Sequence, residues 1–337
     1  MPHQGYTAGN KKKKAAHLWP LFMQTISIAV HGGAGTILKK DLTPPLEQQY
    51  LQALQAALDA GYSLLQQGAP AVDAVQAAVV VLEDCPLFNA GRGSVFAFDG
   101  THQMDAALMD GKDRRAGAVA GVVGIKNPIL LAHRVMTNSQ HVLLAGKGAE
   151  DFAREQGLDF TDAAYFYTHL RYQQWQSLKG SNVSALDHSA ADVATLSKEK
   201  KWGTVGAVAV DAQGHVAAAT STGGMTNKRW GRIGDSPLIG AGTWAHDDTC
   251  AISCTGHGEM FIKAVVAHDI HCLMEYKNKT LQQAMDEVIR VKLKHINGEG
   301  GAIGVDATGN TALVFNSEGM YRGLRSSTGE NKTAIYG

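Results

Sequence analysis

The chain has 337 residues, and its 31 Lys and Arg side chains are balanced by 31 Asp and Glu side chains. This balance gives no global electrostatic argument for binding nucleic acid or an anionic membrane, and no run of 18 or more apolar residues predicts a transmembrane helix. Four cysteines are too few for a disulfide framework in a chain of this size, which favours a reducing compartment, and we expect the cytoplasm.

The first 24 residues are expected to form a tail outside the fold. Lysines at 11–14 and a short apolar run resemble parts of a signal peptide, but the run contains His17 and Pro20 and lacks a clean cleavage site. We interpret residues 1–22 as a disordered tail or as an extension that precedes the true start at Met23. The alternating residues 25–30 then predict the first core strand.

Apolar periodicity and turn residues place the elements of the first half of the chain. Helices are predicted over residues 44–67, 70–82, 128–136 and 145–156. Strands are predicted over residues 94–98, 101–108 and 116–125. The first two of these strands are expected to form a hairpin, because Asp99-Gly100 between them is a favoured hairpin turn. Residues 85–93 are expected to form a loop.

Residues 165–201 show no sustained period and have the composition of a linker. After this linker, strands are predicted over residues 204–211, 215–222, 239–241, 249–255, 301–306 and 311–316. Helices are predicted over residues 257–276 and 281–294, and residues 323–337 are expected to form a loose polar tail. Two mostly antiparallel sheets packed face to face with helices outside, a four-layer αββα sandwich, satisfy this order of elements.

A threonine stands where the linker ends, because the charged residues 197–201 change abruptly into a strand that begins at Thr204. Cleavage before Thr204 would give it a free α-amine with a pKa of about 7.7–8.0, so that one residue would hold both nucleophile and base. Gly203 leaves the preceding carbonyl open to attack by the threonine hydroxyl. Threonine is also common at the start of strands, and spacing alone favours that simpler interpretation.

Residues downstream of Thr204 favour the catalytic interpretation. They include a polar glycine-rich loop that carries Arg232 and Asp235, and a strand-to-helix turn at residues 255–259. With residues 204–206, these segments resemble the plant-type L-asparaginase and isoaspartyl aminopeptidase family of N-terminal-nucleophile hydrolases. The resemblance runs from about residue 28 to 323 without the linker. It also includes HGGAG at 31–35, FNAG at 88–91, MDA at 104–106, MDG at 109–111 and GMYRG at 319–323.

The resemblance implies a precursor that cuts itself between Gly203 and Thr204. Residues 25–203, which include a flexible linker at about 165–203, would form an α subunit, and residues 204–337 a β subunit. Both subunits would belong to one folded αββα domain and assemble as an (αβ)2 heterotetramer. Thr204 would be the nucleophile, and Thr222 would hydrogen-bond to it and tune it.

Five further residues would surround the substrate. Arg232 would bind its α-carboxylate, because a planar guanidinium fixes orientation as well as charge, and Asp235 with the Gly258 carbonyl would bind its α-ammonium. The Thr255 hydroxyl and the Gly256 N–H would form the oxyanion hole. The implied reaction is attack on the side-chain amide of L-asparagine or on the isopeptide of a β-aspartyl dipeptide. Water then releases aspartate from a β-aspartyl ester.

The family also has a structural sodium ion and no catalytic cofactor. The implied ligands are backbone carbonyls of Leu82, Glu83, Cys85, Phe88, Ala90 and Arg92. Arg92 departs from the apolar residue that is commoner in relatives and adds a charge that would disfavour a nearby cation. Arg229-Trp230 departs from a Leu-Pro type of sequence and would alter the rim of the pocket. Asn89 would either help to position the nucleophile or simply cap its loop.

Other interpretations are weaker. A soft-metal cluster drawn from Cys250, Cys254, His257, His268, His271 and Cys272 is compatible with spacing, but cysteine within a strand is usually a small core residue. The glycine-rich residues 31–35 and 145–148 lack the lysine and hydroxyl that end a phosphate-binding loop. The alternative functions are a glycosylasparaginase and a nonenzymatic amino-acid-binding protein on the same scaffold.

Overall fold

The computed structural model describes residues 25–180, 184 and 203–337, and its strands form two sheets packed face to face. The eight-stranded sheet has the order β12-β11-β1-β5-β6-β2-β3-β4, with antiparallel neighbours except for β3 and β4. Its strands are β1 (Ser27–Gly35), β2 (Met104–Asp110), β3 (Ala116–Val122), β4 (Leu143–Ala145), β5 (Val205–Val210), β6 (Val216–Thr222), β11 (Gly319–Ser326) and β12 (Asn331–Tyr336). The four-stranded sheet has the order β10-β9-β8-β7, and all its neighbours are antiparallel. Its strands are β7 (Thr243–Ala245), β8 (Cys250–Gly256), β9 (Gly300–Asp306) and β10 (Thr311–Phe315).

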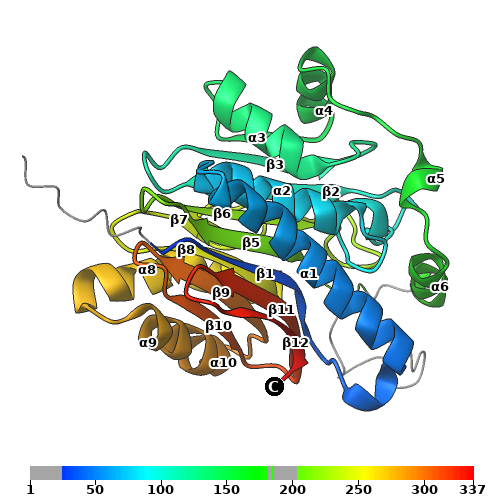
Figure 1. The fold of residues 1–337 in the computed structure, drawn as a ribbon. Helices are drawn as coiled ribbons and strands as arrows, with labels where there is room; N and C mark the ends of the chain where they lie inside the picture. The colour runs from blue at the N-terminus through cyan, green and yellow to red at the C-terminus, as the bar shows by residue number, and fades with distance from the viewer. Residues whose placement is uncertain (1–24, 181–183, 185–202) are drawn as a thin grey trace, which may run out of the picture.

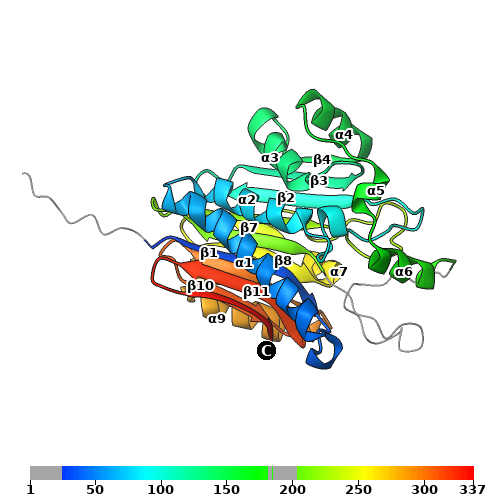
Figure 2. The ribbon, with the colours of Figure 1, turned by 45° about the vertical axis from the view of Figure 1, so that its right-hand side comes forward.

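Helices cover the outer face of each sheet, and Figures 1 and 2 show α1 and α2 lying side by side across the large one. The large sheet is covered by α1 (Pro44–Gln66), α2 (Ala71–Asp84), α3 (Pro128–Asn138) and α4 (Gly146–Glu155). The small sheet is covered by α8 (Val266–Lys277), α9 (Leu281–Met285) and a π-helical stretch (Asp286–Lys292), which α10 (Leu293–His295) continues. Shorter helices are the 3-10 turns Lys39–Asp41 and Gly91–Gly93, with α5 (Ala163–Phe166), α6 (His169–Leu178) and α7 (Gly258–Ala264). The αββα sandwich expected from the sequence is therefore confirmed.

Strand β5 shows how the layers are held together. Its side chains alternate between faces, so Val205 and Ala207 pack in the core between the sheet and its helices, whereas Val208 and Val210 pack between the two sheets. A strand with both faces buried contains no polar residue, which explains the continuous apolar run of this sequence. By the same alternation, Thr204 has the parity of residues that face the other sheet.

The predicted hairpin at residues 94–108 is wrong, although several neighbouring predictions are confirmed. The turn at Asp99 and Gly100 forms, but Phe98 N donates to the carbonyl of Lys228, and Asn227 N donates to the carbonyl of Phe96. Ala97 N still donates to the Thr101 carbonyl at 2.8 Å across the turn, but the segment before the turn otherwise pairs with a distant loop and forms no strand with residues 101–108. Strand β2 begins later than expected and forms its antiparallel pair with β3.

Two segments expected to lack regular structure are ordered. Helix α6 lies inside the expected linker, where the Thr168 side chain caps its first turn and the buried Arg171 Nε donates to the Gly93 carbonyl at 2.9 Å. The rest of that linker, residues 181–183 and 185–202, and the N-terminal tail lie outside the described residues. The expected loose tail forms β12 and the end of β11, which pairs with β1.

Smaller differences have local causes. The predicted strand 239–241 is a turn with one isolated bridge from Ile239 to Thr243, and the strand there is β7. The single helix predicted over residues 257–276 is broken into α7 and α8 at Val265, whose φ of 49° is left-handed. No helix within the described ranges is long and apolar enough to cross a membrane.

Candidate active site

The hydroxyls of Thr204 and Thr222 meet where β5 begins and β6 ends. The antiparallel register pairs Val205 with Ser221. Thr204, one residue before Val205, and Thr222, one residue after Ser221, therefore lie at the same edge of the sheet. Thr204 Oγ1 donates to Thr222 Oγ1 at 3.1 Å, and Thr222 Oγ1 also accepts from Gly224 N at 2.9 Å.

A pocket opens at this edge, with about 370 Å³ of empty space that includes open solvent. It is lined by Asn89, Gly203, Thr204, Thr222, Gly224, Met225, Arg232, Gly234, Asp235, Ser236, Thr255 and Gly256. The structure therefore gathers in one pocket the residues that the sequence assigned to cleavage, nucleophile, substrate head group and oxyanion hole. Gly258 does not line it directly but touches two residues that do.

Arg232 is held by Glu259, a carboxylate in the turn at residues 255–259 to which the sequence alone assigns no role. Its Nε donates to Glu259 Oε1 and its Nη2 to Glu259 Oε2, both at 2.9 Å, which is bidentate geometry. Burial opposes ionisation of Glu259, but the hydrogen bonds and charge of Arg232 outweigh it and lower the pKa of Glu259 below its ordinary value. One edge of the guanidinium is thus oriented by Glu259, which leaves Nη1 to face Gly234 and the pocket.

Asp235 is a buried carboxylate with an unused oxygen. It is 4% exposed, and its Oδ2 has no hydrogen-bond partner among the described residues. Burial raises the pKa of Asp235 to about 7. A Cβ on Gly258 would lie 3.0 Å from Asp235 Oδ1 and 2.8 Å from Arg232 Nη2, so glycine leaves the space that these two side chains occupy. Such a carboxylate is suited to bind a cationic group that restores its charge.

Thr255 and Gly256 come from the small sheet and approach the pocket from the other side. Thr255 is buried at the end of β8, and its Oγ1 accepts from Ala34 N at 3.4 Å. Since this contact uses the hydroxyl as an acceptor, its proton is available to another group. Gly256 follows with a φ of 151°, and a Cβ there would lie 2.4 Å from the carbonyl oxygen of Glu299. Thr255 and Gly256 therefore both line the pocket from the β8 side.

Asn89 joins the loop after α2 to the loop after β6. Its Nδ2 donates to the Gly224 carbonyl at 2.7 Å, and its Oδ1 accepts from Val95 N at 3.0 Å. Gly223 N also donates to the Asn89 carbonyl at 2.9 Å. Asn89 therefore caps its own loop and also holds the backbone that follows Thr222.

Two buried polar groups beside the pocket were not assigned a role from the sequence. Lys228 is 2% exposed, donates to the Gln103 carbonyl at 2.7 Å and lies 4.0 Å from Asp105 Oδ2, while burial lowers its pKa. His31 Nδ1 lies 3.1 Å from the Thr204 carbonyl oxygen. His31 belongs to the motif at residues 31–35 and Asp105 to the motif at residues 104–106. Neither motif indicates which distant residue each side chain contacts.

The loop at residues 82–92 is compatible with a cation held by carbonyl groups. A Cβ on Gly91 would lie 2.4 Å from Glu83 O, and one on Gly93 would lie 2.0 Å from Phe88 O, so these carbonyls face space that only glycine leaves open. Arg92 is exposed and its guanidinium lies over the Tyr165 ring at 5.6 Å. Of the other implied ligands, Leu82 O and Ala90 O accept backbone hydrogen bonds. The carbonyls of Glu83 and Phe88 lie against the backbone of Gly91 and Gly93.

The soft-metal interpretation finds no support in the part of the chain that the structure describes. It contains no group of three or more His, Cys, Asp or Glu side chains placed to hold a metal ion. Cys250 and Cys254 are buried in β8, and burial raises the pKa of both thiols. His271 Nδ1 is instead hydrogen-bonded to Thr249 Oγ1 at 2.7 Å.

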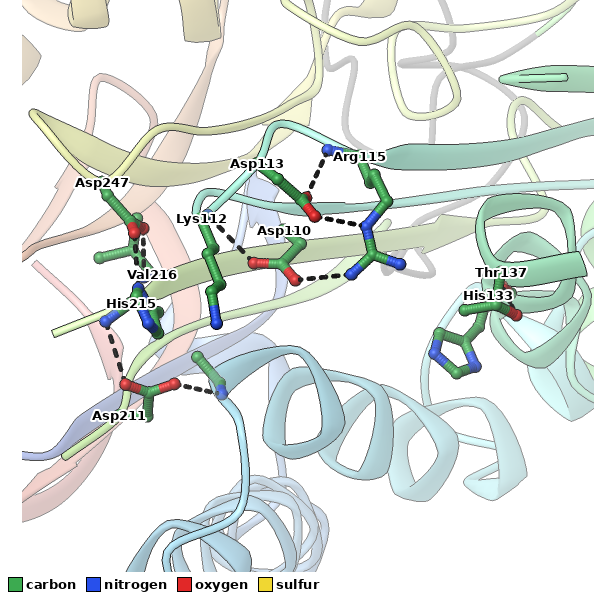
Figure 3. A network of polar contacts seen from close by, with 11 residues as sticks. Asp110, Lys112, Asp113, Arg115, His133, Thr137, Asp211, His215, Val216 and Asp247 are labelled. Atoms are coloured by element: carbon green, nitrogen blue, oxygen red, sulfur yellow. Dashed lines mark hydrogen bonds and ion pairs between the residues drawn. The ribbon is translucent and has the colours of Figure 1, made fainter. Parts of the chain in front are cut away.

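Figure 3 shows a separate polar network at the opposite end of the β5–β6 hairpin. Asp211 Oδ2 accepts from Ala71 N at 3.1 Å, and its Oδ1 accepts from His215 N at 3.0 Å. Asp247 accepts from His215 Nδ1 at 2.7 Å and from Val216 N at 2.9 Å. This network joins the start of α2 to the hairpin and to the loop after β7, so its role is structural.

The layered fold and its threonine-lined pocket define an αββα protein with a polar pocket at the edge of its large sheet. The family model described as Asparaginase matches residues 23–335, and the chain belongs to this family. It is 48% identical to an isoaspartyl peptidase of Escherichia coli, over 92% of this chain and 95% of that protein. It is 49% identical to an isoaspartyl peptidase of Salmonella typhimurium (93% and 99%), and 41% identical to a plant-type L-asparaginase of Pyrococcus abyssi (92% and 100%).

Proposed function

We propose that the chain is a hydrolase that cuts itself at Gly203–Thr204 and then releases aspartate from L-asparagine and from β-aspartyl dipeptides. The observation that carries this proposal is the placement of Arg232 and the underused carboxylate of Asp235 in the pocket that contains the Thr204 hydroxyl. A cationic and an anionic side chain recognise a free amino-acid head group, which leaves the side-chain carbonyl for the nucleophile. The relatives named isoaspartyl peptidase and plant-type L-asparaginase support the same substrates.

Catalysis begins when Thr204 Oγ attacks the side-chain carbonyl and its proton passes to the free α-amine of Thr204. The oxyanion that forms accepts hydrogen bonds from Thr255 Oγ1 and Gly256 N. Collapse of this intermediate breaks the C–N bond, and the leaving ammonia or amine takes the proton from the α-amine. A β-aspartyl ester on Thr204 remains, and Thr222 keeps the ester oxygen oriented.

Water completes the reaction by hydrolysing the ester. The Thr204 amine removes a proton from water, and the hydroxide attacks the ester carbonyl in the same oxyanion hole. The C–O bond then breaks, Thr204 Oγ regains the proton and aspartate leaves. Because the amine exists only after the Gly203–Thr204 bond is cut, the uncut chain lacks the general base. This dependence makes self-cleavage a requirement for turnover.

The decisive experiment is incubation of the purified chain without protease. We expect a new fragment whose N-terminal residue is Thr204, read by mass spectrometry, together with release of aspartate from β-aspartyl-leucine and from L-asparagine. Thr204→Ala should remain uncut and inactive. An uncut wild-type chain with no release of aspartate would contradict the proposal, and activity confined to N-acetylglucosaminyl-asparagine would identify a glycosylasparaginase. L-aspartate binding without turnover would identify a binding protein.

Three finer points belong to this proposal. The two subunits made by cleavage assemble as an (αβ)2 heterotetramer, which sedimentation of the cut protein would test. A structural sodium ion is held by carbonyls of the loop at residues 82–92, including Glu83 and Phe88, where it fixes the loop that carries Asn89 and takes no part in bond making. The enzyme works in the cytoplasm, consistent with its four free cysteines.

A further inference from the structure

His31 lies between the two sheets and joins the nucleophile residue to strand β8. It is completely buried, with Nδ1 3.1 Å from the Thr204 carbonyl oxygen and Nε2 2.9 Å from Ser253 Oγ. The β-ladder reaches His31–Gly206 on one side of β5 and Val205–Ser221 on the other. Pairing therefore starts at Gly206 on the β1 side and at Val205 on the β6 side, both after Thr204, and the His31 side chain contacts the Thr204 carbonyl beyond the end of the ladder.

The position of the imidazole proton follows from these contacts. Burial lowers the pKa of His31 to about 3, against the opposing effect of its hydrogen bond to the Thr204 carbonyl, so the ring is neutral near neutral pH. A carbonyl oxygen only accepts, so Nδ1 must carry the proton and donate to Thr204. Nε2 is then an acceptor, and the Ser253 hydroxyl must donate to it.

Two further hydroxyls extend this order across both sheets. Thr220 Oγ1 lies 2.7 Å from Ser253 Oγ, and Thr243 Oγ1 lies 2.7 Å from Thr220 Oγ1. Each hydroxyl has one proton, and Ser253 has already used its own, so Thr220 donates to Ser253 and Thr243 donates to Thr220. All these side chains are fully buried. The hydroxyl chain Thr243, Thr220, Ser253 and His31 thus runs in one direction, toward the Thr204 carbonyl.

A glycine makes room for this chain on β5. A Cβ on Gly206 would lie 2.0 Å from Ser253 Oγ and 2.5 Å from His31 Nε2. Its far end lies beside the substrate loop: the carbonyl oxygens of Gly242 and Ser236 lie 3.3 Å from Thr220 Oγ1 and 3.1 Å from Thr243 Oγ1, and each shares the single proton that its hydroxyl donates along the chain at the shorter distance of 2.7 Å. Polarised hydrogen bonds in a buried chain strengthen one another, so the last bond, from His31 Nδ1 to the Thr204 carbonyl, becomes stronger.

We propose that His31 is a positioning residue that holds the Thr204 peptide plane through its Nδ1–H, and that Ser253 sets the tautomer needed for this. The inference rests on the proposed function of Thr204. After cleavage, Thr204 is attached to the fold through its carbonyl carbon alone, and that carbonyl is the reference from which its amine and hydroxyl are aimed. Misplacing them reduces the population of molecules ready to attack, which lowers kcat more than it raises KM.

Two substitutions separate the donor to Thr204 from the contact with Ser253. His31→Asn can place its amide N–H near the position of Nδ1, whereas His31→Gln can place its amide near the position of Nε2. We expect His31→Asn to retain kcat within about threefold and His31→Gln to lose about 10- to 100-fold, with little change of KM in either. His271→Asn is the matched control, because His271 is also a buried imidazole bonded to a hydroxyl, and it should leave kcat unchanged.

The tautomer provides a test independent of activity and of variant folding. Nitrogen chemical shifts of the wild-type His31 ring should show a protonated Nδ1 and a bare Nε2 near neutral pH, and a protonated Nε2 would overturn the inference. Equal loss of kcat in His31→Asn and His31→Gln, at matched thermal midpoints, would also overturn it by showing a packing role alone. Failure of wild-type protein to release aspartate would instead refute the proposed function.

Discussion

Arg232 and Glu259 form a bidentate pair, with two N–O distances of 2.9 Å, at the mouth of the pocket that contains Thr204. The pair uses Nε and one proton of Nη2, so the guanidinium is oriented before any substrate arrives. A substrate carboxylate would be met by a cation whose direction is already set. This preorganisation lowers the entropy that binding must overcome.

Arg232→Lys tests this orientation. A lysine keeps the charge but loses the planar fork that can bind Glu259 and a substrate carboxylate at once. We expect KM for L-asparagine to rise about 10- to 100-fold, equivalent to roughly 1.5–3 kcal/mol for a charged hydrogen bond. Steady-state kinetics of the cut enzyme would measure it. Glu259→Gln keeps one acceptor for Arg232 and should show a smaller rise of KM. An unchanged KM in Arg232→Lys would show that Arg232 does not bind the substrate carboxylate through its planar fork.

Thr222→Val tests the partner of the nucleophile. Valine has a similar shape but gives no oxygen to Thr204 Oγ1 or to Gly224 N, which Thr222 now bonds at 3.1 and 2.9 Å. We expect kcat to fall about 10- to 100-fold, the cost of roughly 1–3 kcal/mol for losing a buried partner. The rate of self-cleavage, followed by electrophoresis, should fall as well. Wild-type rates in this variant would show that the hydroxyl pair is incidental.

Asp235 should make binding of L-aspartate depend on pH. Burial raises the pKa of Asp235 from 3.8 to about 7, so in the free folded protein the carboxyl is protonated below that pH and charged above it. Since the charged form binds the ligand ammonium, the dissociation constant should be flat above pH 7 and rise about tenfold for each unit below it. Calorimetric titrations between pH 5.5 and 8 would measure this slope.

The Asp235 carboxyl affects folding stability in the opposite direction: ligand binding strengthens as pH rises, whereas folding stability falls. Between pH 3.8 and about 7 the folded state holds a proton that the unfolded chain has released, so this group makes the folded state less stable as pH rises through that window. Asp235→Asn carries no titrating proton and should remove both trends. A dissociation constant for L-aspartate that keeps its slope in Asp235→Asn would show that another group titrates.

Lys228 and Asp105 should matter for stability. Their side chains are 1% and 0% exposed and lie 4.0 Å apart, so removal of one leaves the other charge buried. We expect Lys228→Met to lose about 3–5 kcal/mol of unfolding free energy, the usual cost of breaking a buried pair. Urea denaturation would measure it. Lys147→Met breaks an exposed pair with Asp151 and is the control, with a change of no more than about 1 kcal/mol.

Local sequence was sufficient for most elements of the fold. The helices α1, α3 and α4 and the strands of the β5–β6 hairpin follow from apolar period and from Pro and Gly, because these signals act over a few residues. The αββα arrangement then follows from the order of the elements. The pocket residues Thr204, Arg232 and Asp235 were predicted from motifs that resemble those of the asparaginase family in order and spacing.

Tertiary structure decided what depends on partners distant in sequence. Strand β12 lies in a polar segment whose place is set by pairing with β11, and α6 is held by Arg171 reaching Gly93. Glu259 lies 27 residues from Arg232, and His31 lies 173 residues from Thr204. Short-range patterns determine which residues can form strands, helices and reactive groups. Which buried donor meets which acceptor is set by packing the two sheets together, because only then must every enclosed polar group find a partner.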